Sequence, residues 1–395
     1  MLRVQEIITW KEFEELRPTW NDLLDRCPDA TIFQTWEWIA SCIQALGVGK
    51  TPVCLTVWDA DRLVGIAPFE IAGGVTLRRL QFIGTDVSDY LDCVKAPDLA
   101  ESVMDTIQQW LEQHKNRWHL IHFQNVRAGS QMLALFTGNG YRPERFKADN
   151  SYYIELPQTW DAMSERLKSR KRNELSRASR LIERDFALEI SDLRGDKLQE
   201  GLESLFTLHT AFWRQRGLPG MLGSERKRKF YRVLAKRLVE RDQFRLYGMR
   251  LNGELQAVDM CFVFKNRMYG YLCGRNPDLV EYGIGKALVA HVIKDAIDLG
   301  LSEFDFLRGD EQYKRWWMGE LTPTYRLSVQ RGILGKFAAA SLLFDRKIGY
   351  RVGIVAHRLA SLSFHPPKLK IKPQIAEPAP AKPADQTPAA RKIAG

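Results

Sequence analysis

Residues 303–317, EFDFLRGDEQYKRWW, concentrate titratable side chains at the end of an apolar strand. Asp305 interrupts that strand, and the aromatic residues on either side of it should point to the opposite face. Acidic residues early in a helix are favoured electrostatically, so capping explains part of the cluster. It explains neither Asp305 nor two tryptophans beside three cations, and we therefore interpret the segment as functional. Its polar members are Arg308, Asp310, Glu311, Tyr313, Lys314 and Arg315.

A second candidate is the strand-to-helix turn that contains Gly283 and Gly285. Glycine lets the backbone approach a ligand closely, and a helix N-terminus offers unpaired N–H groups and a partial positive charge. This combination can hold a diphosphate, and Lys286 would add a cation. An ordinary turn that uses glycine for its positive φ explains this segment equally well, because two glycines are a weak signal.

A third candidate is the helix that ends in HTAFWRQRG. His209, Trp213 and Arg216 share one stripe with the apolar residues of the preceding turns, so they face inward. Inward-facing polar groups need partners, and a single histidine in such a place is usually a satisfied core residue. The three side chains together, ending at Gly217, favour the wall of a pocket.

A basic helix is predicted over 164–185, with five arginines on one narrow face. Acidic residues on the same helix offset much of this charge. We therefore favour a solvated, salt-bridged face over an anion-binding stripe. No other pattern in the chain indicates a nucleic-acid-binding fold. The five arginines are Arg166, Arg170, Arg177, Arg180 and Arg184.

The composition restricts the class of protein. The chain has 395 residues, which suggests two or three domains, and its net charge of +10 makes an anionic partner plausible. Its six cysteines form no close pairs, which is typical of reduced, buried thiols and not of a disulfide framework or a zinc site. The N-terminus lacks a signal-peptide pattern, and no apolar run approaches the ~20 residues of a membrane span. We expect a soluble, cytoplasmic protein without a bound metal.

Helix and strand signals follow a similar order twice along the chain, which suggests duplication. Helices, then an antiparallel meander, then alternating helix and strand imply a mixed sheet covered by helices. In the first portion we expect strands at 2–8, 91–94 and 119–123, helices at 12–25, 34–46, 98–112 and 129–138, and a hairpin at 52–71. In the second portion we expect, in order, the strand SYYIEL, a basic helix at 160–184, a strand at 186–190, helices at 196–215 and 224–240, and a three-stranded meander. These are followed by a helix at 284–299, the strand EFDFL, a short helix near 310–317 and the strand TYRLSVQ.

The predicted architecture is α+β, with two tandem units at 1–150 and 151–330, each a mixed, mostly antiparallel sheet. The second unit carries the candidate chemistry. Residues 331–365 read as an amphipathic helical extension, which we expect to pack on the second unit. The alternative is docking at the inner face of the membrane, with basic side chains toward anionic headgroups. Residues 366–395, rich in Pro, Ala and Lys, are predicted to be disordered.

These segments together resemble the GNAT acyltransferases of the CelD type, which are linked to cellulose and exopolysaccharide biosynthesis and related to Fem-type aminoacyltransferases. The resemblance rests on His-x3-Trp-x2-Arg-Gly, the glycine loop and FDFLRGDEQYKRWW, with IFQTWEWIASCIQALG and SDYLDCVKAPD in the front half. It covers roughly residues 10–330. In one departure, Gly283-Ile284-Gly285 stands where the family usually has Ser-Pro-Gly. In addition, Val280 occupies the first, normally polar, position of the diphosphate signature.

The resemblance implies two GNAT-like domains and an acyl-CoA donor, with acetyl-CoA as the first candidate. It places Tyr313 as the acid that protonates the departing thiolate. Asp259, alone among apolar residues in AVDMCFVF, and Asp305 are the base candidates, because a desolvated carboxylate is a stronger base; Glu311 is a further catalytic candidate. The donor would contact Tyr282, Gly283, Ile284, Gly285, Lys286 and Ala287, and the acceptor His209, Trp213, Arg216, Arg308, Asp310 and Lys314.

The implied function is transfer of an acyl group from acyl-CoA to an amine or hydroxyl of a polysaccharide or cell-envelope precursor. Two alternatives differ in donor or in activity. A Fem-type enzyme would use aminoacyl-tRNA, the arginine helix would contact phosphates, and binding would weaken steeply with salt. A non-catalytic GNAT-like protein would instead bind a partner in an envelope or exopolysaccharide synthesis complex. Nucleic acid is an expected partner only under the tRNA alternative.

Overall fold

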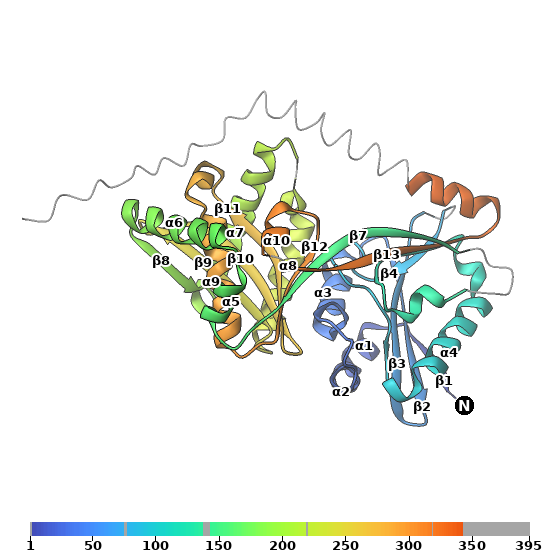
Figure 1. Cartoon of the computed structure of the whole chain (residues 1–395). Helices are drawn as coiled ribbons and strands as arrows, with labels where there is room; N and C mark the ends of the chain where they lie inside the picture. The colour runs from blue at the N-terminus through green and yellow to red at the C-terminus, as the bar shows by residue number, and fades with distance from the viewer. Residues whose placement is uncertain (1, 75–76, 137–142, 219, 318, 343–395) are drawn as a thin grey trace, which may run out of the picture.

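The computed structural model describes residues 2–74, 77–136, 143–218, 220–317 and 319–342. Its strands form one 13-stranded mixed sheet with the order β1-β2-β3-β4-β6-β13-β7-β12-β11-β10-β9-β8, and β5 pairs with β3. Figure 1 shows two lobes covered by helices, joined by the long strands β7 and β13. The α+β class with a mixed, mostly antiparallel sheet, predicted from the order of elements, is confirmed.

The first half contains β1 (Arg3–Ile7), α1 (Trp10–Glu15), α2 (Arg17–Arg26), α3 (Trp36–Leu46), β2 (Thr51–Asp59), β3 (Arg62–Ala72), β4 (Arg79–Phe82), β5 (Val94–Lys95), α4 (Ala100–Gln113) and β6 (Leu120–Arg127). After β7 (Glu144–Glu155), the second half contains α5 (Trp160–Arg166), α6 (Ser169–Asp185), β8 (Leu188–Asp192), α7 (Leu198–Gln215), α8 (Glu225–Val239), β9 (Phe244–Leu251), β10 (Glu254–Phe264), β11 (Arg267–Arg275), α9 (Ile284–Asp298), β12 (Glu303–Arg308) and α10 (Gln312–Trp316). The last strand is β13 (Glu320–Gln330).

The two halves have the same topology. In the first, β1 to β4 are antiparallel, α4 follows, and β6 pairs in parallel with β4. In the second, β8 to β11 are antiparallel, α9 follows, and β12 pairs in parallel with β11. Because parallel neighbours need a crossover, each helix covers the sheet at this point. The order repeated in the sequence is therefore a repeat in space.

The halves exchange their last strands. β7 follows the first half along the chain but pairs with β12 of the second, whereas β13 follows the second half but pairs with β6 of the first. The two exchanged strands also pair with each other, from Glu320 opposite Tyr153 to Ser328 opposite Glu144. A boundary drawn at residue 150 falls within β7.

Packing across the halves is extensive on the face that carries α3 and α8. Trp38 of α3 is fully buried and makes edge-to-face contacts with Phe230 of α8 and Phe262 of β10. The Arg241 guanidinium pairs with the buried carboxylate of Glu37 at 3.4 Å. Aromatic burial of this size is typical of a domain core, so the halves share one core.

Several local predictions need correction. The basic helix expected over 160–184 is two helices, because the chain leaves helical conformation at Leu167 and Lys168, so Arg166 does not share a face with the arginines of α6. In place of the helix expected at 129–138 there is a 3-10 turn at Gln131–Ala134. The helix expected over 12–25 begins earlier and is interrupted at Leu16.

After β13 the described chain ends in a helix over 332–342, the start of the predicted extension. The rest of that extension and the predicted disordered tail lie outside the described residues. Among the helices that are described, none is long and apolar enough to cross a membrane. The six cysteines are free thiols, as expected, and all but Cys273 are buried.

Candidate active site

The sheet opens between β11 and β12. These parallel strands pair only from Arg267 opposite Glu303 to Tyr269 opposite Asp305, and beyond that point they separate. Each strand also bulges at the opening. Tyr271 is the extra residue of β11 against β10, and Phe306 is the extra residue of β12 against β7. Bulges bend a strand and redirect its side chains, so the opening is built into the backbone.

A cavity of about 1500 Å³ occupies this opening. Its walls come from α6, α7, α8, β10, β11, α9, β12 and α10 of the second half, from the segments after α7 and β11, and from the loop after β4 of the first half. Its predicted members are His209, Trp213, Arg216, Asp259, Gly283, Ile284, Gly285, Lys286, Arg308, Glu311, Tyr313 and Lys314. Tyr282, Ala287, Asp305 and Asp310 do not line it.

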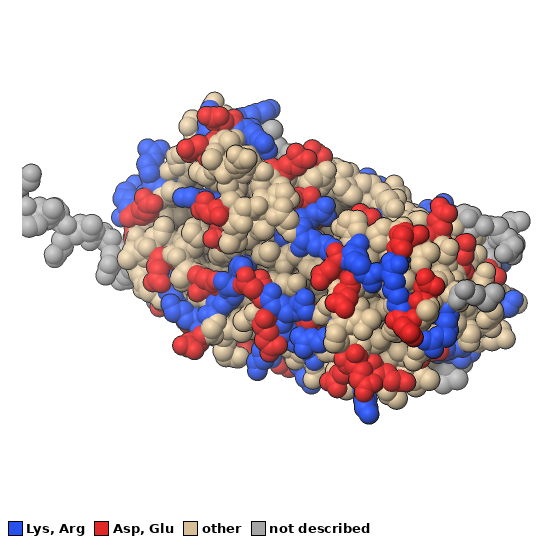
Figure 2. All heavy atoms as spheres, turned by 90° about the horizontal axis from the view of Figure 1, so that it is seen from below, with Lys and Arg blue, Asp and Glu red and all other residues tan. Residues whose placement is uncertain are grey.

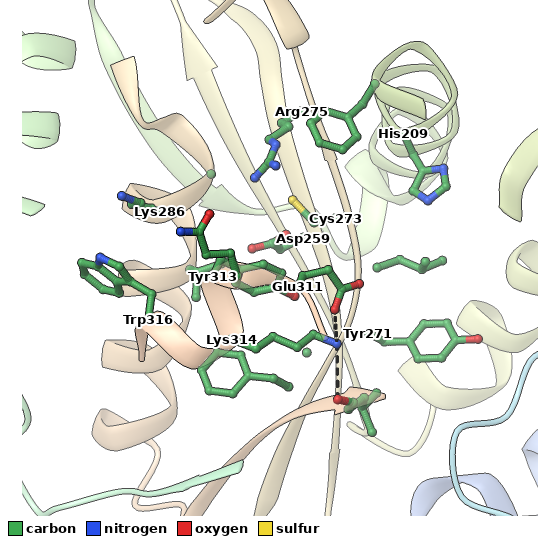
Figure 3. Close-up of a pocket in the computed structure, with 18 of the residues that line it drawn as sticks. His209, Asp259, Tyr271, Cys273, Arg275, Lys286, Glu311, Tyr313, Lys314 and Trp316 are labelled. Carbon is green, nitrogen blue, oxygen red and sulfur yellow. Dashed lines mark hydrogen bonds and ion pairs between the residues drawn. The ribbon is translucent and has the colours of Figure 1, made fainter. Parts of the chain in front are cut away.

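Tyr313 projects from α10 into the middle of the cavity (Figure 3). Its ring packs edge-to-face on Phe306, with centroids 6.2 Å apart. Burial raises the pKa of its phenol well above the ordinary value, and the negative charges of Glu311, Cys273 and Asp259 add to the effect. The hydroxyl therefore stays protonated at neutral pH and can donate a proton or a hydrogen bond.

Asp259 lies beside Tyr313 in Figure 3 and is only 6% exposed. It stands on β10 directly opposite Cys273 of β11. Burial raises the pKa of its carboxyl to about 6, opposed by a hydrogen bond from Cys273 and by the positive charge of Arg275. A carboxylate with such a pKa is mostly ionised at pH 7 and accepts a proton more readily than an ordinary aspartate.

Lys314 lines the cavity with its ammonium group held by the surrounding chain. Its side chain is 4% exposed, and its ammonium donates to the carbonyl oxygens of Leu307 (3.3 Å) and Arg308 and pairs with Glu311 at 3.0 Å. Gly309 permits this arrangement, because a Cβ there would lie 2.2 Å from a Glu311 carboxylate oxygen, and its φ is +124°. The buried ammonium is thus fully engaged with groups of its own segment.

Asp305, a predicted base, faces away from the cavity. The alternation of the strand turns Phe304 and Phe306 toward the cavity and Asp305 to the other face. Its Oδ1 accepts from the Leu307 N–H at 2.7 Å, and the hydroxyl of Tyr90 donates to Oδ2 at 2.9 Å. Burial raises the pKa of this carboxyl to about 7. Because Leu307 has a φ of +59°, the geometry favours a role for Asp305 in holding this strained residue.

The glycine loop adopts the predicted conformation. Gly283 has a φ of +70° and caps α9, and a Cβ on Gly285 would lie 2.6 Å from the Arg275 guanidinium. Lys286, expected to add a free cation, pairs with Glu174 of α6 at 2.9 Å. The hydroxyl of Tyr282 donates to Asp185 outside the cavity. Gly285 therefore gives Arg275 room beside the first turn of α9.

The residues expected to hold the acceptor lie in different surroundings. The Trp213 indole N–H donates to His209 Nε2 at 3.0 Å, and burial lowers the pKa of His209 to about 4, so the ring is neutral with its proton on Nδ1. Arg308 is held by the first half, through Asp89 at 3.3 Å. Asp310 is turned outward, paired with Arg315 and accepting from the Tyr152 hydroxyl.

Sequence reasoning missed several residues of the cavity wall. Arg275 and Cys273 are two apart on one strand and therefore share a face, a spacing that was visible in RMYGYLCGR. No local sequence pattern indicated that residues of the first half would line the cavity across the junction. The missed side chains that could bind a ligand or take part in a reaction are Asp86, Asp89, Lys171, Phe212, Tyr271, Cys273, Arg275 and Trp316.

The family model described as an acetyltransferase (GNAT) domain matches residues 169–315, from the start of α6 to α10. This segment is therefore similar to GNAT acetyltransferase domains. The matched segment supplies most of the cavity wall; the rest comes from the loop after β4 of the first half, from Lys168 just before α6, and from Trp316 and Trp317. No curated protein matched the sequence.

Solved structures share the fold at low identity. The crystal structure of FemX superposes with a TM-score of 0.60 at 10% identity, covering 82% of this chain and 96% of that one. The C-terminal domain of a putative lysylphosphatidylglycerol synthetase from Agrobacterium fabrum gives 0.53 at 13% identity, covering 84% and 96%. L-PGS from Bacillus licheniformis gives 0.52 at 13% identity, covering 84% and 96%. The likeness therefore extends over both halves.

Proposed function

We propose that the chain is an acyltransferase that moves an acyl group, acetyl first, from acyl-CoA to an amine or hydroxyl. GNAT domains generally use acyl-CoA. The observation that carries the proposal is the opening between β11 and β12, where a buried carboxylate and a protonated tyrosine face one cavity. A polysaccharide or cell-envelope precursor as acceptor is motivated by the sequence resemblance to CelD-type proteins.

The donor is expected to enter along β11. Beyond Tyr269 this strand no longer pairs with β12, so its main chain can receive an extended arm as an added strand. The diphosphate would then reach the first turn of α9 beyond Gly283, where the first N–H groups of a helix have no partner within the helix; the N–H of Gly283 itself donates to the Val280 carbonyl at 3.0 Å. The reacting thioester would lie near Tyr313 and Asp259.

The chemistry follows from these two residues. The acceptor amine or hydroxyl attacks the thioester carbonyl carbon, and Asp259 takes the proton that the nucleophile loses. As the C–S bond breaks, Tyr313 gives its proton to the departing thiolate sulfur, so the products are the acylated acceptor and the free thiol. A carboxyl group and a phenol whose pKa values lie far apart are suited to these opposite tasks, one accepting a proton and the other donating one.

The first half is expected to serve as a structural partner. Its α4 corresponds to α9 but begins after Pro97 with Asp98 and Glu101 near its start, where a diphosphate would be repelled. The equivalent of the opening is filled by Phe69, Phe82 and Phe123, whose rings pack at 4.8 to 5.1 Å.

An aminoacyl-tRNA donor is the second candidate function, and two observations favour it. α6 exposes Arg170, Arg177 and Arg180, of which Arg170 lines the cavity, and the fold likeness to FemX extends over most of both chains. Against it, α6 also carries acidic partners, and on the face drawn in Figure 2 basic and acidic side chains are interspersed. Phosphate contacts of this kind would weaken steeply with salt.

A thermal-shift experiment separates the candidates. The full chain is melted with acetyl-CoA, longer acyl-CoAs, or charged tRNA, at low and at physiological salt. A donor present at 100 times its dissociation constant should stabilise the fold by about 2.7 kcal/mol. Stabilisation by an acyl-CoA supports the first proposal, and salt-sensitive stabilisation by tRNA alone supports the second. Absence of both leaves the non-catalytic alternative.

A further inference from the structure

Two arginines stack on one aromatic ring at the mouth of the cavity. The guanidinium carbons of Arg216 and Arg275 lie 3.5 and 4.3 Å from the ring centroid of Phe212. Arg216 and Phe212 come from the last turns of α7, whereas Arg275 is the last residue of β11. Figure 3 shows Arg275 above Asp259 and Tyr313, on the side of α7. Hereafter these three side chains are called the arginine stack.

Neither cation of the stack has a direct carboxylate partner, although the charge of Arg275 is felt by the Asp259 carboxyl in the same cavity. Among the described residues, no carboxylate forms an ion pair with Arg216 or Arg275, and the hydrogen bond of Arg216 is to the carbonyl of Phe212 at 3.1 Å. Burial lowers the pKa of Arg216, and repulsion by Arg275 contributes. Arg216 is exposed and Arg275 is half-buried, and two adjacent like charges repel each other unless an anion joins them.

A similar stack elsewhere in the same domain is handled differently. Arg228 and Arg232 lie 5.8 and 5.2 Å from the ring centroid of Phe206. There, Arg232 pairs with Glu203 at 2.8 Å and with Glu225 at 2.6 Å. In that stack two carboxylates pair directly with one of the arginines, whereas in the arginine stack neither guanidinium has such a direct partner among the described residues.

An unused donor lies in the same wall. His209, one turn before Phe212 on α7, is 5% exposed and lines the cavity. Its Nε2 accepts from Trp213, so its proton is on Nδ1, and Nδ1 has no hydrogen-bond partner among the described residues. A buried N–H without a partner is costly, so a ligand atom that accepts from it would stabilise the complex.

We infer that the arginine stack binds a phosphate-type oxyanion of a ligand. Planar guanidiniums match phosphate geometry with two parallel N–H bonds, and stacking holds them oriented before the ligand arrives. The inference deepens the proposed function and uses the same cavity. The oxyanion has two sources, the diphosphate of the donor or an acidic group of the acceptor.

Calorimetric titration of the full chain at low salt tests the stack. The probes are inorganic pyrophosphate, CoA, and pantetheine, which lacks phosphate. Arg216→Gln and Arg275→Gln should each weaken pyrophosphate binding by about 10- to 100-fold, the effect of losing charged hydrogen bonds. Arg3→Gln is the matched control, because that exposed arginine on β1, at the edge of the sheet in the first half, lies outside the cavity and should leave binding unchanged. Melting without ligand verifies that each variant is folded.

The outcomes separate the sources. If both stack variants weaken pyrophosphate and CoA but not pantetheine, the oxyanion is the diphosphate of the donor. If they weaken pyrophosphate and leave CoA unchanged, it is an acidic group of the acceptor. The inference is overturned if wild type binds no pyrophosphate, if folded stack variants bind it as well as wild type, or if Arg3→Gln weakens it equally. Pyrophosphate binding without any CoA binding would overturn the proposed donor alone.

Discussion

Asp259 and Asp305 show how far single residues can be interpreted from the sequence. Both interrupt apolar strands, and both were predicted as bases. Alternation along the strand placed Asp305 opposite its phenylalanine neighbours, but it could not tell which face would border the cavity. The partner of Asp305 is Tyr90, 215 residues away, so only the folded chain reveals its role in positioning Leu307. Asp259 borders the cavity because its strand neighbour is the bulged β11.

Tyr313→Phe tests the proposed acid. The substitution keeps the ring and its contact with Phe306, so packing should survive. General acid catalysis contributes about 10²- to 10⁴-fold, so turnover of acyl-CoA with its acceptor should fall by that factor while donor affinity changes little. Steady-state turnover and a separate binding titration check this. Turnover within a few-fold of wild type would remove Tyr313 from the mechanism and direct attention to Glu311.

Asp305→Asn tests the buried carboxyl through stability. The folded chain holds the Asp305 proton up to a pH of about 7, whereas the ordinary pKa is 3.8, so raising the pH between these values costs stability. The slope is at most about 1.4 kcal/mol per pH unit. An amide resembles the protonated acid, so the unfolding free energy of Asp305→Asn should fall less between pH 5 and pH 8.

Urea unfolding at several pH values provides this measurement. Asp310→Asn is the control, because Arg315 lowers the pKa of that exposed carboxyl to about 2 and it stays ionised over the whole range. Parallel pH dependences of wild type and Asp305→Asn would show that the Asp305 carboxyl keeps an ordinary pKa in the fold.

At the scale of elements, periodicity located most helices and strands, because amphipathic spacing follows directly from burial. The hairpin of β2 and β3, the meander of β9 to β11, and α9 lie where the sequence placed them. The break between α5 and α6 was missed, since Leu167 is apolar and fits the helical stripe although it is buried between two helices. The bulges at Tyr271 and Phe306 follow from pairing with distant strands, which periodicity does not encode.

Gly285→Asp tests the first turn of α9 as the place of the donor diphosphate. Any side chain there meets the Arg275 guanidinium, and an aspartate would pair with it and repel phosphate. CoA binding should weaken by more than about 10-fold, whereas Gly285→Ala should cost less, because the far end of Arg275 can move. Calorimetric titration of both folded variants measures this. Wild-type affinity in Gly285→Asp would place the diphosphate elsewhere.

At the scale of the molecule, the sequence indicated duplication but not how the copies join. Similar element order predicts two similar units; it does not predict that β7 and β13 change places. Either arrangement buries similar strand faces, and the choice depends on long-range pairing across the whole chain. The exchange also places the loop after β4 against the second half, where Asp89 holds Arg308 at the cavity wall.

The exchange predicts that a chain ending at Trp317 loses structure in the first half, far from the truncation. Without β13, both β6 and β7 lose a ladder partner, and the buried side chains of Leu327 and Val329, each worth about 1.5–3 kcal/mol, are removed. Hydrogen exchange of the β6 amides should become fast and the cooperative melting transition should broaden or vanish. A chain ending at Ser363 keeps β13 and should melt like the full chain, since only its last residues, interpreted as a disordered tail, are missing. If the β6 amides stay protected from exchange in the chain that ends at Trp317, the first half folds without the exchanged strand, and the two units are independent despite their shared sheet.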